Sequence, residues 1–240
     1  MEKSKDLNPF IDTYSNDPFH NENQRGLNRY VHCCIQNSHD FDRYLELGIG
    51  HGVTLNRLSQ QFKQVIVLEG ASNLVKEYRE KYSNVEIIET WFETFSTQEK
   101  FNNIGMGFIL EHVDDPMAIL KQFAGFLTEN GRIFVGVPSA SSMHRLLAQQ
   151  AGLLENIEQL SAIDLAFGHK RLWSYQKWRD VIESNGFTIE KAQGIAFKPF
   201  TTPQLASLNL DLKVIQALDD LSTNYPELAN ALFFEISHDQ

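Results

Sequence analysis

The chain of 240 residues lacks three features that would assign it to a familiar class: a cysteine framework, a long apolar run and a cluster of basic residues. Its two cysteines, Cys33 and Cys34, are adjacent in a helix-like segment, which suits neither a disulfide nor a metal site. No apolar run approaches membrane-spanning length, and the first residues show no signal-peptide pattern. We therefore expect a cytoplasmic protein with no membrane partner and no metal site.

The charge balance is acidic, with 31 Asp and Glu residues against 21 Lys and Arg residues and a formal net charge of −10. Because phosphate backbones need a basic face, a nucleic acid is not expected as a partner. A small anionic substrate held by a few local arginines remains compatible with this charge. With 42% apolar residues, the chain has enough material for a sizeable buried core.

Apolar segments of strand length alternate with helical patterns through most of the chain. Strands are predicted at residues 42–48, 64–70, 84–90, 104–113, 131–138, 188–197 and 231–237. Helices are predicted at residues 23–37, 53–62, 71–82, 116–127, 174–187 and 203–221, with Asp115 as the N-cap of the fourth and Gly186 closing the fifth. Such alternation is typical of a parallel, doubly wound α/β sheet.

Three segments fall outside the alternation. Residues 1–40 form a polar and aromatic segment that we expect to be an N-terminal helical cap. Residues 139–172 and 199–230 interrupt the pattern after the fifth and sixth strands. Because ligands of open α/β sheets bind beyond the carboxyl ends of the strands, these two insertions are expected to form a lid over a substrate.

The stretch RYLELGIGHG, residues 43–52, passes from a strand into three closely spaced glycines. A P-loop is excluded because no Lys-Ser/Thr pair follows, and the G-x-G-x-G spacing differs from the G-x-G-x-x-G of NAD-binding turns. Glu46 would repel a pyrophosphate but would suit a ligand with an ammonium group. Glu69 ends the second strand, where a carboxylate contacts ribose hydroxyls, a feature shared with NAD enzymes.

Three motifs in order, ELGIGHG, VIVLEGA and FILEHVDDP, resemble class I S-adenosylmethionine-dependent methyltransferases over roughly residues 40–140. The resemblance implies a single domain over residues 1–240, with a Rossmann-like sheet of seven strands, mostly parallel with an antiparallel last strand, and S-adenosyl-L-methionine as cofactor. It places one group of residues against the methionine part, the ribose and the sulfonium: Glu46, Gly48, Ile49, Gly50, Glu69, Gly70, Leu110, Glu111 and His112.

The sequence departs from the family pattern at the expected adenine contact. Trp91 and Phe92 occupy the position of the commoner Gly-Asp pair, and we expect them to pack on the purine unless they are simply core residues. Asn102 or Asn103 stands where the family often has an acid. Tyr14 is expected to close over the cofactor, and the alternative is that this segment only packs on the sheet edge.

The methyl acceptor is expected to contact the segment from residue 138 to residue 174. His169 is the expected base, with His144 and His112 as further catalytic candidates. Arg145 and Arg171 are expected to anchor the substrate, together with His20, although either arginine could instead pair with the surplus acids. The leucines between Leu205 and Leu221 are interpreted as a packed face or a dimer contact.

The predicted function is methyl transfer to an oxygen or nitrogen of a small molecule, anionic or sugar-like, in a biosynthetic pathway. Methylation of a peptide, a protein or a quinone-type precursor stays open, as does a non-catalytic adenosyl-binding module. An NAD-dependent reductase is disfavoured by Glu46 and by the glycine spacing. A monomer or a homodimer is expected.

Overall fold

The computed structural model describes residues 20–238, which form a seven-stranded sheet. The strands are β1 Arg43–Leu47, β2 Gln64–Glu69, β3 Glu86–Glu89, β4 Phe101–Gly107, β5 Leu127–Pro138, β6 Phe187–Gly194 and β7 Ala231–His238. Their order is β3-β2-β1-β4-β5-β7-β6, and only β7 runs antiparallel to its neighbours. The predicted fold, with an antiparallel last strand, is confirmed.

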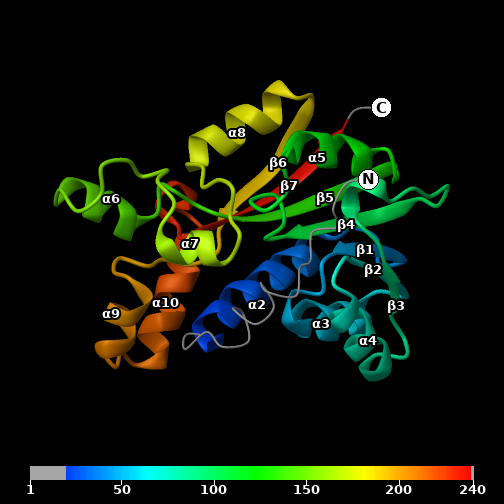
Figure 1. The fold of residues 1–240 in the computed structure, drawn as a ribbon, viewed down its shortest axis with the longest axis horizontal. Helices are drawn as coiled ribbons and strands as arrows, with labels where there is room; N and C mark the ends of the chain where they lie inside the picture. The colour runs from blue at the N-terminus through cyan, green and yellow to red at the C-terminus, as the bar shows by residue number, and fades with distance from the viewer. Residues whose placement is uncertain (1–19, 239–240) are drawn as a thin grey trace.

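Two helical layers cover the sheet, one on each face (Figure 1). The helices α5 Pro116–Ala124 and α8 Tyr175–Ser184 share one hydrophobic core with the sheet, which includes Phe123 and Trp178. The helices α2 His20–Asn37, α3 Val53–Gln61 and α4 Ser72–Lys81 pack into a second core on the opposite face. The Asp115 carboxylate accepts hydrogen bonds from the backbone N–H groups of Met117 and Ala118, which confirms the predicted N-cap of α5.

Helix α2 lies close to the sheet because its Tyr30 side chain rests on strand glycines. A Cβ atom at Gly107 would lie 2.4 Å from the Tyr30 ring, and one at Gly136 would lie 2.7 Å from it. Tyr30 is fully buried, and its hydroxyl donates to the Phe134 carbonyl at 3.3 Å. This packing of Tyr30 on the two glycines fixes α2 across β4 and β5. The first turns of α2 therefore lie at the end of the sheet where the glycine turn lies.

The predicted strand at residues 104–113 is wrong at both ends. Phe101 and Asn103 already pair with β5, and the chain leaves the sheet after Gly107. Phe108 has φ = +59° and donates its N–H to the Gly136 carbonyl at 2.7 Å, so the backbone turns there. An unbroken apolar run concealed this end of the strand.

The single helix predicted at residues 203–221 is also wrong. The structure contains α9 Thr202–Ser207 and α10 Leu212–Ser222, separated by a turn. Asn209 has φ = +47°, which interrupts the helical backbone, and the Asp211 side chain accepts a hydrogen bond from Lys213 N–H to start α10. The leucine spacing continues across this break and so gave no signal of it.

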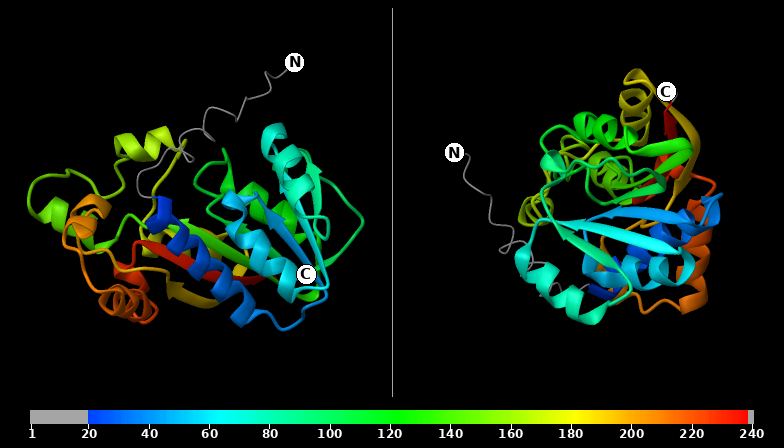
Figure 2. Two further views of the ribbon diagram at one scale, coloured as in Figure 1. Left: turned by 90° about the horizontal axis from the view of Figure 1, so that it is seen from below. Right: turned by 90° about the vertical axis from the view of Figure 1, so that its right-hand side faces the viewer.

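The predicted lid insertions contain α6 Met143–Gln150, α7 Ala162–Ala166, α9, α10 and the short helix η3 Pro226–Leu228. Helices α6, α9 and α10 lie at one end of the molecule in both Figure 1 and Figure 2. Two further short helices, η1 Gly50–Gly52 and η2 Phe92–Thr94, follow β1 and β3. Within residues 20–238, no helix is long and apolar enough to cross a membrane.

Candidate active site

A cavity of about 1090 Å³ opens at the carboxyl ends of β1, β2 and β4. One part of its wall comes from the loops after these strands, and another comes from α2, α9 and α10. The cavity brings together most of the residues that the sequence singled out: Glu46, Gly48, Ile49, Gly50, Glu69, Gly70, Trp91, Phe92, Glu111, His112 and His169.

The glycine turn between β1 and α3 needs glycine for two separate reasons. Gly48 and Gly52 have φ = +81° and φ = +71°, values that side-chain-bearing residues rarely adopt. At Gly52, a Cβ atom would also lie 2.3 Å from the Tyr78 ring of α4. The turn is fastened to the neighbouring strand by a 2.8 Å hydrogen bond from Gly48 N–H to the Leu68 carbonyl.

The Glu69 carboxylate links this turn to the start of α4. Its Oε2 accepts from Ile49 N–H at 3.1 Å, and its Oε1 accepts from Ala71 N–H at 2.8 Å. Burial raises the pKa of Glu69, and these backbone hydrogen bonds act in the opposite direction. The backbone N–H groups of Ile49, Ala71 and Gly70 act on this carboxylate without using all of its lone pairs, so it can still accept from a hydroxyl donor.

Glu46 lies under the glycine turn as a carboxylate without a cation. It is 2% exposed, and its Oε2 has no hydrogen-bond partner among the described residues. Burial raises the pKa of Glu46 to about 8, and the Tyr44 hydroxyl opposes that rise. An isolated buried carboxylate is costly, so this position suits a positively charged ligand group.

The loop after β3 supplies an aromatic wall. Trp91 and Phe92 line the cavity, while Phe92 also packs against the first hydrophobic core. The Gln122 side chain of α5 donates to the Phe92 carbonyl at 2.8 Å and so holds this loop on the sheet. The loop presents a flat apolar surface next to Glu69. The Thr90 N–H donates a hydrogen bond to the Glu69 backbone carbonyl at 3.0 Å.

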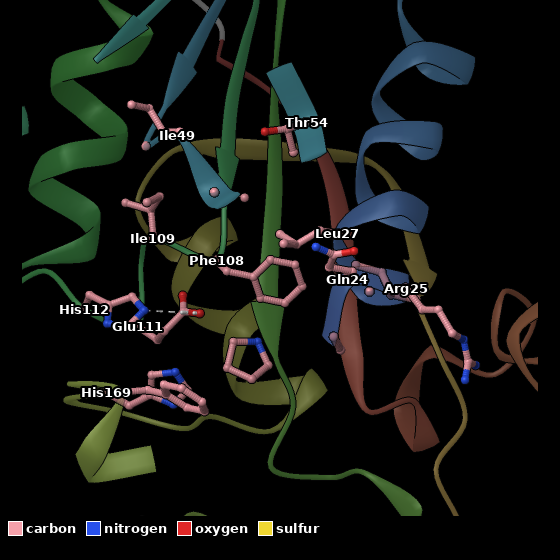
Figure 3. A pocket seen from close by; sticks show the side chains of 18 of the residues that line it. Gln24, Arg25, Leu27, Ile49, Thr54, Phe108, Ile109, Glu111, His112 and His169 are labelled. Atoms are coloured by element: carbon pink, nitrogen blue, oxygen red, sulfur yellow. Dashed lines mark ion pairs between the residues drawn. The ribbon is translucent and has the colours of Figure 1, made fainter. Parts of the chain in front are cut away.

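The turn after β4 carries a cluster of polar side chains (Figure 3). Glu111 is 1% exposed, and neither of its carboxylate oxygens has a hydrogen-bond partner among the described residues. His112 Nε2 lies 4.0 Å from Glu111 Oε1, and the His112 and His169 rings meet edge to face at 4.9 Å. Burial raises the pKa of Glu111 to about 7 and lowers the pKa of His112 to about 4.

Asp164 of α7 orients His169. Its Oδ1 lies 3.2 Å from His169 Nδ1, and its Oδ2 accepts from Ser161 N–H at 2.7 Å. Hydrogen bonds from His169 and Ser161 lower the pKa of Asp164 to about 2, against the effect of its burial. With the Nδ1 proton donated to Asp164, the Nε2 atom of His169 is left as an acceptor.

The structure places four predicted residues away from the cavity wall. Leu110 is fully buried in the first core. The Arg145 guanidinium donates to the carbonyls of Ile157 and Gln159, and the Arg171 guanidinium donates to the carbonyls of Leu110 and Asp114. His144 lies behind the wall, where burial lowers its pKa to about 3.

These arginines therefore hold loops in place: Arg145 holds residues 157–159 and Arg171 holds the turn after β4. The roles assigned to Tyr14 and to the His20 side chain lie outside the described residues; α2 begins at His20.

Lys198, which sequence reasoning missed, is the lysine that lines the apolar end of the cavity. Its ammonium group contacts the Thr202 hydroxyl at 3.2 Å, and no described carboxylate lies within 4 Å of it. Burial lowers its pKa to about 8. By contrast, two other cations of the cavity wall, Arg25 and Lys170, are paired with Asp219 and Asp114. A lone lysine in a loop gives no sequence signal of this kind.

Comparison with known proteins agrees with this geometry. Residues 19–192 match the family described as a methyltransferase domain. The chain belongs to this family. It is an S-adenosylmethionine-dependent methyltransferase. An uncharacterized methyltransferase of Alkaliphilus oremlandii is 25% identical over 123 residues, which cover 50% of this chain and 55% of that protein. The match thus spans about half the length of this relative.

Solved structures share the fold of this methyltransferase at low sequence identity. A chain of the complex between the Haloferax volcanii Trm112 methyltransferase activator and a methyltransferase has a TM-score of 0.65 at 13% identity, covering 96% of this chain and 98% of that one. The plantazolicin methyltransferase BpumL, in complex with a triazolic desmethylPZN analog and S-adenosylhomocysteine, has a TM-score of 0.61 at 15% identity, covering 97% of this chain and 91% of that one. The N-methyltransferase NodS of Bradyrhizobium japonicum gives 0.55 at 13%, covering 94% and 90%.

The residues of the methyltransferase fit its cofactor. Glu46 Oε2, which has no hydrogen-bond partner among the described residues, suits the ammonium group of the methionine part, and the remaining acceptor capacity of Glu69 suits ribose hydroxyls. The glycine turn allows close approach of backbone, and Trp91 offers an aromatic surface to a purine.

Proposed function

We propose that this methyltransferase transfers a methyl group to a hydroxyl oxygen of a small molecule with a largely apolar body and an anionic group. The observation that carries the proposal is a cluster on the cavity wall, in which Glu111 and His112 follow β4 and His169 comes from the first insertion. A hydroxyl must lose its proton during methyl transfer, whereas a neutral amine attacks without a base. Three proton-accepting groups at one point therefore favour an oxygen acceptor over nitrogen.

S-adenosylmethionine, when bound, supplies a methyl carbon on a sulfonium, and the transfer forms an O–C bond, breaks the S–C bond and leaves neutral S-adenosylhomocysteine. The chain contributes the placement of the acceptor. His169 Nε2 accepts the hydroxyl proton, while Asp164 holds the ring and stabilises its protonated form. The Phe108 ring stands beside this cluster in Figure 3.

The far end of the cavity supports an apolar acceptor. Its wall includes apolar side chains of α9, α10 and the loop between them: Leu205, Leu210, Leu212, Ile215 and Leu218. Lys198 is the cation available to an anionic group, because Arg145 and Arg171 are engaged by backbone carbonyls. A sugar, with polar groups on every side, matches this wall less well.

The proposal is tested first by binding and then by turnover. S-adenosylhomocysteine should raise the melting temperature, and NADH should not. S-adenosylhomocysteine release is then followed over a panel of phenols, each with and without a carboxylate, in the wild type and in His169→Ala. We expect turnover with a carboxylated phenol and at least a 100-fold loss of kcat in His169→Ala. Turnover of amines alone would contradict the oxygen assignment, and cofactor binding without turnover on any acceptor would favour a non-catalytic module.

A further inference from the structure

Glu111 is a deeply buried carboxylate whose ion-pair contact among the described residues is with the His112 imidazole, at 4.0 Å between Oε1 and Nε2. Its side chain is 1% exposed, and both oxygens are buried without hydrogen-bond partners among the described residues. In Figure 3 the carboxylate projects into the cavity beside His112. Arg171 is near, but its guanidinium donates to the carbonyls of Leu110 and Asp114. A carboxylate this deep is stabilised only when a positive charge or several donors reach it.

Two imidazoles complete a set of three ligand atoms. One donor atom from each of Glu111, His112 and His169 lies within 4.8 Å of the other two. Donors bound ~2 Å from one first-row transition cation stand roughly 3–4 Å apart. Small side-chain rotations therefore bring the three atoms onto a single ion, and the open side of the set faces the cavity.

The surroundings of the histidines also match a metal centre. His169 Nδ1 pairs with Asp164 Oδ1 at 3.2 Å, which leaves Nε2 for a metal. Asp164 is itself fixed by Ser161 N–H at 2.7 Å. The His112 side chain forms a hydrogen bond with the Gly168 backbone. Metal-binding histidines usually use their second nitrogen in this way, on a carboxylate or a carbonyl.

We propose that Glu111, His112 and His169 bind one divalent first-row transition cation of the Zn²⁺ class, with an open coordination position toward the acceptor. Two imidazoles and one carboxylate favour such ions over Mg²⁺, which prefers oxygen ligands. Cation binding itself does not depend on the proposed function. The catalytic role of the cation does depend on that function. The acceptor hydroxyl coordinates the ion, the pKa of the hydroxyl falls, and the hydroxyl proton passes to solvent before the O–C bond forms. In the loaded enzyme His169 is then a ligand in place of a base.

The binding test uses the full chain after dialysis against a chelator. Calorimetry with ZnCl₂ should give one site per chain, and CoCl₂ should give the visible absorption bands of a nitrogen- and oxygen-bound Co²⁺ ion. Glu111→Gln should weaken Zn²⁺ affinity at least 100-fold, and Asp164→Asn should weaken it 10- to 100-fold. The exposed His39 provides the control, since His39→Ala should leave the affinity unchanged.

Absence of Zn²⁺ and Co²⁺ binding would overturn the proposal, as would a site whose affinity is the same in Glu111→Gln. Circular dichroism of each variant identifies a loss that merely reflects unfolding, and His169→Ala then provides a second variant for the same titration. Full methyl transfer by the chelator-treated enzyme would overturn the catalytic role of the cation and leave His169 as the base. Zn²⁺ binding together with no S-adenosylhomocysteine binding would instead contradict the proposed function and leave the metal site intact.

Discussion

The two ends of the cavity are built differently. The cofactor end consists of short turns directly after β1 and β2, where Glu69 bonds to N–H groups of both turns. The acceptor end is assembled from distant segments, with His169 from the first insertion and Lys198 from the loop before the second. Local backbone geometry therefore defines the cofactor end, whereas tertiary packing defines the acceptor end. Variants at the two ends should consequently affect different measurements.

The largest expected effect belongs to Glu69. In Glu69→Ala both turns lose their shared acceptor and the ribose hydroxyls lose their partner, so S-adenosylhomocysteine affinity should fall at least 100-fold, about 2.7 kcal/mol. Calorimetry measures the change. Lys198→Gln is the comparison variant and should bind S-adenosylhomocysteine within about twofold of wild type. Equal losses in the two variants would contradict the division of the cavity into two ends.

The second effect concerns the glycine turn. Gly52→Ala combines φ = +71° with a Cβ atom only 2.3 Å from the Tyr78 ring, and should lower the free energy of unfolding by about 2–3 kcal/mol. Gly152 offers a matched control, since it has the same φ of +71° and no atom within 4 Å of an added Cβ. Gly152→Ala should cost only about 1 kcal/mol. Urea unfolding separates the two values, and equal costs would show that Tyr78 moves aside.

The third effect is a pH dependence from Glu46. Its pKa rises from an ordinary value near 4.5 to about 8 in the folded chain, so the folded state binds the proton more tightly. Stability should then fall as pH rises from 4.5 to 8, by on the order of 2 kcal/mol between pH 6 and pH 8. Glu46→Gln should make this slope shallower in urea unfolding, and the buried Glu111, with a pKa raised to about 7, accounts for a remaining fall in the same pH range. Tyr30, Cys34 and Tyr44 face the same carboxylate, and burial raises their pKa values well above the ordinary range.

A slope in Glu46→Gln as steep as in the wild type would assign the pH dependence to another group. Saturating S-adenosylhomocysteine provides an independent check, because its ammonium group stabilises the charged carboxylate and should reduce the slope in the wild type.

The smallest effect is expected at Lys198. With a carboxylated acceptor, Lys198→Gln should raise KM about tenfold, roughly 1.4 kcal/mol, and leave kcat nearly unchanged, because the lysine anchors the acceptor away from the reacting atoms. Lys213 at the start of α10 is exposed, so Lys213→Gln is the matched control. An unchanged KM for Lys198→Gln, with the control also unchanged, would place the anionic group elsewhere.

The same division explains what the sequence could predict. Glu46, Gly48 and Glu69 lie within 24 residues, and their spacing follows from the βαβ connection that contains them. The alternation of apolar strands with helices predicted the doubly wound α/β sheet for the same reason, whereas the antiparallel last strand was implied by the family resemblance. The turn and the alternation depend on residues that are close together in the chain, so the sequence alone was enough to predict them.

The acceptor end could not be predicted as well, because its contacts join residues that are far apart in the chain. Arg145 and Arg171 have the same charge as Lys198, but backbone carbonyls of the neighbouring loops engage both guanidinium groups. Asp164 was not singled out, although it orients His169. The end of β4 at Phe108 was missed because an apolar residue with positive φ looks like one more strand residue.

Phe108 also determines how easily the acceptor preference of this enzyme can change. A phenylalanine with φ = +59° carries a conformational cost of about 1–2 kcal/mol that glycine would not have. Its ring stands inside the cavity, beside the polar cluster (Figure 3). Replacing it with glycine would relieve the backbone and enlarge the space for the acceptor in one step. We therefore expect Phe108→Gly to admit bulkier acceptors, at a position where the backbone conformation favours glycine and the loss of the Tyr30 ring contact opposes the change.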